Sequence, residues 1–261
     1  MKSIRLLSIG NSFSDDMQQY MYDIFKENGY ETSICNLYVG GCTLKRHYDN
    51  IKNDTHEYAY KVYDKNGFHE VYDYAISDCL KEKWDIITLQ QASYESGDKT
   101  KFIDIETGEN YVNLIHDWFM ENYENYNEIR WIYHATWSYD KDFKGDTFRI
   151  YDYSQEKMER GMIDCLNKYI LYNPIFESVI PNFYSIKILR DDYHINPYRD
   201  GFHLSFDLGR YLAGFIACMT IIKDVPHRPK TTCLNITKEE KRLCREIAHY
   251  LKDHKDDLYI M

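Results

Sequence analysis

The sequence predicts an α/β protein, a three-layer α/β/α sandwich in which helices cover both faces of a five-stranded parallel sheet. Two observations support this fold class. Short apolar runs typical of buried strands alternate with longer segments that have helical spacing, and polar or glycine-containing loops follow the strands. Ligands bind such sheets at the carboxyl ends of the strands, so we expect a functional site in these loops.

The first predicted strand, residues 4–9, leads into a tight turn at Gly10, Asn11 and Ser12. A segment with helical spacing follows at residues 17–25. This order places the Ser12 hydroxyl at a helix N-terminus, where unpaired N–H groups stabilise negative charge. The alternative is that Ser12 or Ser14 only caps the helix.

The second predicted strand, residues 31–39, runs into Gly40 and Gly41, where the backbone can approach a ligand closely or simply turn. Residues 47–75 are predicted to be an insertion. Within it, residues 58–63 and 68–74 alternate with period two around Asn66 and Gly67, which predicts a β-hairpin rich in tyrosine. We expect this hairpin to stand off the main sheet and help to wall a site; a packing or oligomer-contact role is the alternative.

Three further strands are predicted at residues 84–89, 129–135 and 178–181, with helices at 73–83, 106–123, 151–172 and 186–192. The third strand ends in Gln90 and Gln91. The fourth is followed by Trp137 and Tyr139, which are candidate pocket walls, although core packing is an alternative for both.

A buried helix is predicted at residues 206–222, and a polar helix at about 237–252 with a capping box formed by Thr237 and Glu240. We therefore predict one main domain over residues 1–223, including the insertion at about 47–75. Residues 224–261 form a C-terminal extension whose helix packs on the same domain.

Composition argues against two classes of partner. The net charge is −10 and the basic residues are scattered, so neither nucleic acid nor an anionic membrane is an expected partner.

Seven cysteines without a Cys-x-x-Cys pair indicate reduced buried thiols. With no apolar run of membrane-spanning length and no signal sequence, we expect a cytoplasmic protein unless a leader has been removed; the sequence does not predict its oligomeric state.

Asp200 and His203 lie three positions apart in a loop that precedes a predicted helix. In a turn, this spacing lets the carboxylate bind one imidazole nitrogen while the other nitrogen acts as a base. A serine hydroxyl is a weak nucleophile until such a base removes its proton. A cap beside a surface histidine is the alternative, and a metal site lacks a third ligand of suitable spacing.

Several blocks of the chain resemble the SGNH hydrolases, the GDSL-like lipase and esterase superfamily, and in particular an uncharacterised bacterial branch of it. The blocks, which span residues 4–222, are Gly10-Asn-Ser-Phe-Ser14, Gly41-Cys-Thr43, Leu89-Gln-Gln-Ala-Ser93, Thr136-Trp-Ser-Tyr139 and Asp200-Gly-Phe-His-Leu-Ser205. The resemblance implies a flavodoxin-like sandwich and metal-independent hydrolysis of esters without a cofactor, often deacetylation of carbohydrates.

Carried onto this chain, the resemblance implies that Ser12 is the nucleophile, His203 the general base and Asp200 the residue that orients it. The backbone N–H groups of Ser12 and Gly41 would form the oxyanion hole.

The asparagine of the superfamily's third block is missing, so the side chain of Gln90 or Gln91 would supply the third donor. Asn11, Trp137 and Tyr139 are candidate substrate contacts.

Three functions are compatible with these residues. The first is a serine esterase acting on O-acetyl or other acyl groups of carbohydrates or small esters through an acyl-enzyme. The second is an acyltransferase that delivers the acyl group to a sugar hydroxyl. The third is a glycan-binding protein on a hydrolase scaffold with little or no turnover.

Overall fold

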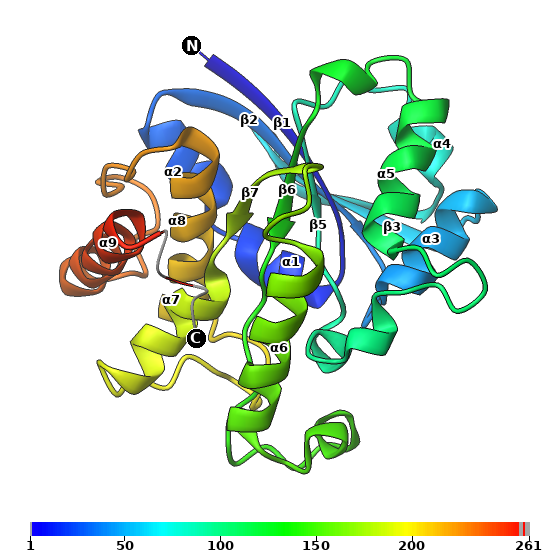
Figure 1. The fold of residues 1–261 in the computed structure, drawn as a ribbon. Helices are drawn as coiled ribbons and strands as arrows, with labels where there is room; N and C mark the ends of the chain where they lie inside the picture. Colours follow the sequence, from blue (N-terminus) through cyan, green and yellow to red (C-terminus); the bar gives the residue numbers. More distant parts are fainter. Residues whose placement is uncertain (1, 256–257, 259–261) are drawn as a thin grey trace.

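The computed structural model describes residues 2–255 and 258. Its centre is one mixed sheet of seven strands in the order β4-β3-β2-β1-β5-β6-β7 (Figure 1). The strands are β1 (Lys2–Gly10), β2 (Tyr30–Tyr38), β3 (Tyr58–Asp64), β4 (Gly67–Tyr74), β5 (Ile86–Leu89), β6 (Arg130–His134) and β7 (Phe176–Ile180).

Five neighbouring strands run parallel, β2, β1, β5, β6 and β7. Continuous apolar sequence produces this arrangement, because both faces of such strands are covered; all four residues of β5 are buried, for example. The shared direction brings the carboxyl ends of the strands to one edge of the sheet, and the loops that follow them meet there.

The helices pack in two groups on the two sides of the sheet. One group surrounds α8, which contacts α1, α2, α7 and α9, and in the other α3 packs on α5. Figure 1 shows the sheet passing between them. The helices are α1 (Ser12–Gln18), α2 (Met21–Glu27), α3 (Leu44–Lys52), α4 (Ile76–Cys79), α5 (Tyr111–Asn122), α6 (Gln155–Tyr169), α7 (Asn182–Asp191), α8 (Leu208–Ile222) and α9 (Lys238–Asp253).

The tyrosine-rich hairpin is present, but the prediction that it stands off the main sheet is wrong. β3 pairs with β2 in antiparallel register, with Ala59 opposite Tyr38 and Tyr63 opposite Ile34, and β4 pairs with β3. The hairpin thereby satisfies backbone groups that β2 would otherwise leave unpaired. Its turn points toward the first residues of β2, at the opposite edge of the sheet from the loop that follows β2.

Three local elements also differ from the predictions. The segment that follows β2 contains the helix α3, which the sequence did not predict; the Thr43 hydroxyl caps it by accepting a hydrogen bond from the Arg46 N–H at 3.1 Å. In place of the first predicted helix, at residues 17–25, the structure has two short helices, α1 and α2. The helix predicted at residues 73–83 is the single turn α4, because β4 continues to Tyr74.

The C-terminal helix α9 begins with the predicted capping box between Thr237 and Glu240. Its apolar side contacts α8 and α7, and Cys244, Ile247 and Leu251 are buried there. All seven cysteines are unpaired and buried, as predicted. Among the described residues, no helix has both the length and the apolar character needed to cross a membrane.

Candidate active site

The site is built around Ser12, the first residue of α1. The preceding Asn11 is buried and caps the helix, because its side-chain oxygen accepts a hydrogen bond from the Phe13 N–H at 3.0 Å. Ser12 itself is partly exposed. Within the described part of the chain its backbone N–H has no hydrogen-bond acceptor, as is usual in the first turn of a helix.

The loop before α8 places His203 against Ser12. Two backbone contacts fold this loop into a narrow turn: Tyr198 bridges to Leu204, and the Arg199 N–H donates to the His203 carbonyl at 3.0 Å. His203 Nε2 lies 2.8 Å from Ser12 Oγ. A hydroxyl and an imidazole 191 positions apart in the sequence are therefore hydrogen-bonded to each other.

Asp200 holds the other side of the imidazole. Its Oδ2 lies 2.8 Å from His203 Nδ1, and its Oδ1 accepts hydrogen bonds from the backbone N–H groups of His203 and Phe202 at 2.8 and 3.3 Å. Partial burial would raise the pKa of Asp200, but these hydrogen bonds lower it below its ordinary value. The ionised carboxylate favours the tautomer that carries its proton on Nδ1, which leaves Nε2 free to accept the Ser12 proton.

Asp16 connects the two parts of the site and was not predicted. It is fully buried on α1, one turn after Ser12, and its Oδ2 accepts a hydrogen bond from the Leu204 N–H at 2.8 Å. Its Oδ1 lies 2.5 Å from Arg210 Nη2 and 3.2 Å from Arg199 Nη1. Burial raises the pKa of Asp16, and Arg210, the Leu204 N–H and Arg199 oppose that rise.

The loop after β2 supplies a second unpaired backbone donor, at Gly41. This residue has a φ of +60°, in the left-handed region that favours glycine, and the Tyr94 hydroxyl donates to its carbonyl at 3.2 Å. Within the described residues, the Gly41 N–H has no acceptor.

Gln90 and Gln91 are buried and bonded to other groups. Gln90 Nε2 donates to Asn11 Oδ1 at 2.6 Å, while its oxygen accepts from the Ser14 hydroxyl at 2.7 Å. Gln91 Nε2 donates to the Lys101 carbonyl at 2.9 Å, and its oxygen accepts from the Leu44 N–H at 2.9 Å. These bonds connect neighbouring loops, and none of them involves Ser12.

Trp137 and Tyr139 lie in the core rather than on a pocket wall. Their exposed fractions are 0% and 1%. Trp137 stacks on Phe13 at a centroid distance of 4.4 Å and donates from Nε1 to the Phe202 carbonyl at 2.7 Å. It therefore contacts both the helix that begins at Ser12 and the loop that carries His203. Asn11, at 0% exposure, acts as the helix cap described above. The positions of these three residues do not support their prediction as substrate contacts.

His134, at the end of β6, is also buried. Its ring bonds to Gln90 Oε1 at 2.8 Å and to Asn182 Nδ2 at 3.1 Å, and burial lowers its pKa to about 3. It is therefore neutral and structural. No group of three or more His, Cys, Asp or Glu side chains among the described residues is arranged to hold a metal ion.

Comparisons with known proteins identify relatives. The family model described as "Domain of unknown function (DUF4886)" matches residues 5–250. The crystal structure of a DUF4886 family protein from Bacteroides uniformis has a TM-score of 0.83 and 28% identity, covering 98% of this chain and 97% of that chain. A protein from Slackia heliotrinireducens, provisionally classed as an SGNH hydrolase, has a TM-score of 0.54 and 17% identity, covering 84% of this chain and 100% of that chain.

The comparison with curated proteins gave no match. The similarity to the Slackia heliotrinireducens protein concerns the fold, since the two sequences share little identity. The family match covers nearly the whole chain, including Ser12, Asp200 and His203. The chain therefore belongs to the DUF4886 family, and its α/β fold is similar to that of an SGNH hydrolase.

Proposed function

We propose that the protein is a serine ester hydrolase that works through an acyl-enzyme. The single observation that carries this proposal is the continuous hydrogen-bonded series Ser12 Oγ to His203 Nε2 and His203 Nδ1 to Asp200 Oδ2, with 2.8 Å at each step. A hydroxyl, a base and an orienting carboxylate in this order are the groups that nucleophilic acyl transfer requires.

In the first half of the reaction, His203 Nε2 takes the Ser12 proton as Oγ attacks the ester carbonyl. The tetrahedral intermediate collapses, the bond to the alcohol breaks, and His203 gives the proton to the leaving oxygen. In the second half, His203 takes a proton from water, the hydroxide attacks the acyl group on Ser12, and the proton returns to Ser12 as the carboxylic acid leaves. Asp200 stabilises the imidazolium in both halves.

The negative oxygen of each tetrahedral intermediate needs hydrogen-bond donors. We assign this role to the backbone N–H groups of Ser12 and Gly41, because neither has an acceptor within the described residues. Ser12 also lies at the positive end of the α1 dipole. Gln90 and Gln91 are left out of the assignment, since their side chains are bonded elsewhere.

The proposed substrate is an O-acetyl or other acyl ester of a carbohydrate or a small alcohol. This part of the proposal follows from the resemblance of the sequence blocks. A panel of acetylated oligosaccharides and small esters tests it, with released acetate as the readout and Ser12→Ala as the matched control. We expect the wild-type protein to release acetate from at least one member and Ser12→Ala to release none.

Two outcomes of this panel favour the other functions. Binding of a glycan without release of acetate would indicate a binding protein. Transfer of the acetyl group to an added sugar in preference to water would indicate an acyltransferase.

Asp16 provides a prediction about how the site is positioned. Replacing it with asparagine removes the charge that Arg210 and Arg199 bind and weakens its hold on the loop that carries His203. We expect the free energy of unfolding to fall by about 3 kcal/mol, since one partner of a buried ion pair is lost. We also expect kcat to fall about tenfold with KM unchanged, because a misplaced base slows chemistry more than binding.

Asp15→Asn is the matched control, because Asp15 lies on the same helix and its ion pair with Lys61, at 2.6 Å, does not touch the loop. Urea unfolding and steady-state kinetics measure both effects. Equal losses of kcat in the two variants would show that Asp16 does not position His203.

A further inference from the structure

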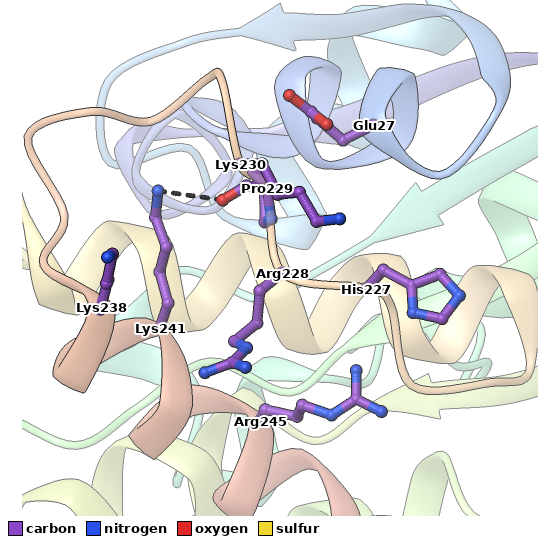
Figure 2. A pocket seen from close by; sticks show the side chains of 8 residues that line it. All are labelled: Glu27, His227, Arg228, Pro229, Lys230, Lys238, Lys241 and Arg245. Atoms are coloured by element: carbon purple, nitrogen blue, oxygen red, sulfur yellow. Dashed lines mark hydrogen bonds between the residues drawn. The ribbon is translucent and has the colours of Figure 1, made fainter.

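A basic cavity lies away from Ser12, between the end of α2 and the start of α9. Its volume is about 870 Å³, and Figure 2 shows the side chains that line it. Most of them come from α9 and from residues 224–237, which connect α8 to α9 and are called the strap here. The lining residues are Glu27, His227, Arg228, Pro229, Lys230, Lys238, Lys241 and Arg245.

Two of the cations hold the strap in place. Lys241 is buried, and its Nζ donates to the carbonyls of Pro229 and Thr232 at 3.2 and 3.1 Å; Figure 2 shows the first of these bonds. Arg245 Nη1 donates to the Pro226 carbonyl at 2.9 Å. On the opposite side, Glu27 accepts a hydrogen bond from the Thr231 N–H at 3.1 Å. The cavity therefore has a wall fixed by several hydrogen bonds.

The other cations have no countercharge. Within the described residues, the side chains of Arg228, Lys230 and Lys238 form neither a hydrogen bond nor an ion pair. Five Lys and Arg side chains line the cavity against one carboxylate, that of Glu27, in a chain that has 32 basic and 42 acidic residues. Like charges gathered at one place repel each other unless an anion neutralises them.

The lining also restricts the kind of anion. Among the described residues that line the cavity there is no Phe, Tyr or Trp, so charge rather than stacking on a large ring must provide most of the affinity. Its volume suits a small molecule. A long polyanion would be repelled by the rest of the chain, whose net charge is −10. Arginine and lysine together bind phosphate groups well, since arginine offers two parallel donors and lysine a point charge.

We propose that the basic cavity binds a small molecule that carries more than one phosphate group. Arg228 and Lys238 contact the phosphates, while Lys241 and Arg245 fix the strap and add positive charge. The cavity shares no lining residue with the Ser12 site: Glu27 is the last residue of α2, whereas Ser12 is the first residue of α1. The proposal therefore does not rest on the proposed hydrolysis.

Calorimetric titration of the full chain with pyrophosphate at low ionic strength tests this proposal. We expect saturable binding of one pyrophosphate per chain, weakened by added salt. Arg228→Gln and Lys238→Gln should each weaken the affinity about tenfold, the effect of losing one charge-assisted hydrogen bond. Ser12→Ala should bind pyrophosphate as the wild type does.

Arg242→Gln is the matched control, because Arg242 lies on α9 outside the lining and its Nε is 3.4 Å from Glu246. It should bind pyrophosphate with unchanged affinity, and acetate, with a single charge, should not bind the wild type. The proposal is overturned if pyrophosphate does not bind at millimolar concentration. It is equally overturned if the double variant Arg228→Gln/Lys238→Gln binds as tightly as the wild type, if Arg242→Gln weakens binding as much, or if acetate binds as well as pyrophosphate.

Discussion

Ser12→Ala is expected to lower kcat/KM for p-nitrophenyl acetate by about 10⁴-fold or more. The reason is that alanine removes the atom that forms the acyl-enzyme, so hydrolysis must proceed by direct attack of water. The backbone N–H groups of residue 12 and Gly41 remain, and residual activity above the uncatalysed rate would come from them. Spectrophotometric release of p-nitrophenolate measures the change.

Ser14→Ala is the matched control, since Ser14 lies on the same helix but donates to Gln90 Oε1. It should lose stability, because a buried hydrogen bond is removed, and keep most of its activity. Thermal unfolding of both variants separates loss of chemistry from loss of fold. Substantial turnover by a folded Ser12→Ala protein would exclude Ser12 as the nucleophile.

His203→Ala is expected to lower kcat by a similar factor, about 10⁴-fold. Without the imidazole, none of the described residues has a group within hydrogen-bond distance of Ser12 Oγ that takes its proton, and the neutral hydroxyl is a poor nucleophile. Because the side chain of His203 is partly exposed, the variant should remain folded. Burst kinetics with p-nitrophenyl acetate measure its acylation rate.

Asp200→Asn is the variant that isolates the orienting role. The asparagine oxygen can still accept from the backbone N–H groups of His203 and Phe202, so the turn is preserved. Its amide nitrogen, however, faces Nδ1 as a donor and favours the tautomer with the proton on Nε2, which cannot accept the Ser12 proton. We expect kcat to fall by about 10²- to 10⁴-fold with KM little changed. Retention of full activity in this variant would show that Asp200 is not needed.

Continuous apolar runs predict the parallel sheet, because parallel strands are covered on both faces. Each strand from β1 to β7 lies at or within a few residues of its predicted position. The resemblance of the blocks that contain Ser12 and His203 implies that the two residues meet, and the structure brings them within hydrogen-bond distance. The hairpin shows a limit of this reasoning. Period-two alternation identifies β3 and β4 as strands, but it does not say that β3 pairs with β2.

The details of the site depend on side-chain directions that the sequence does not encode locally. Gln91 and Trp137 both follow strands at the correct edge, yet they point into the structure rather than toward Ser12. Asp16 was missed because an acidic residue near a helix start usually faces solvent. Its position one turn after Ser12 was the signal that could have identified it.

The central claim is that His203 activates one serine, Ser12, for attack. Labelling with a fluorophosphonate tests it most directly, because the probe reacts covalently with activated serines, and peptide mass spectrometry locates the label. We expect one label per chain on Ser12 in the wild-type protein, and almost none in His203→Ala. Absence of labelling in the folded wild-type protein, or a label on another residue, would contradict the claim.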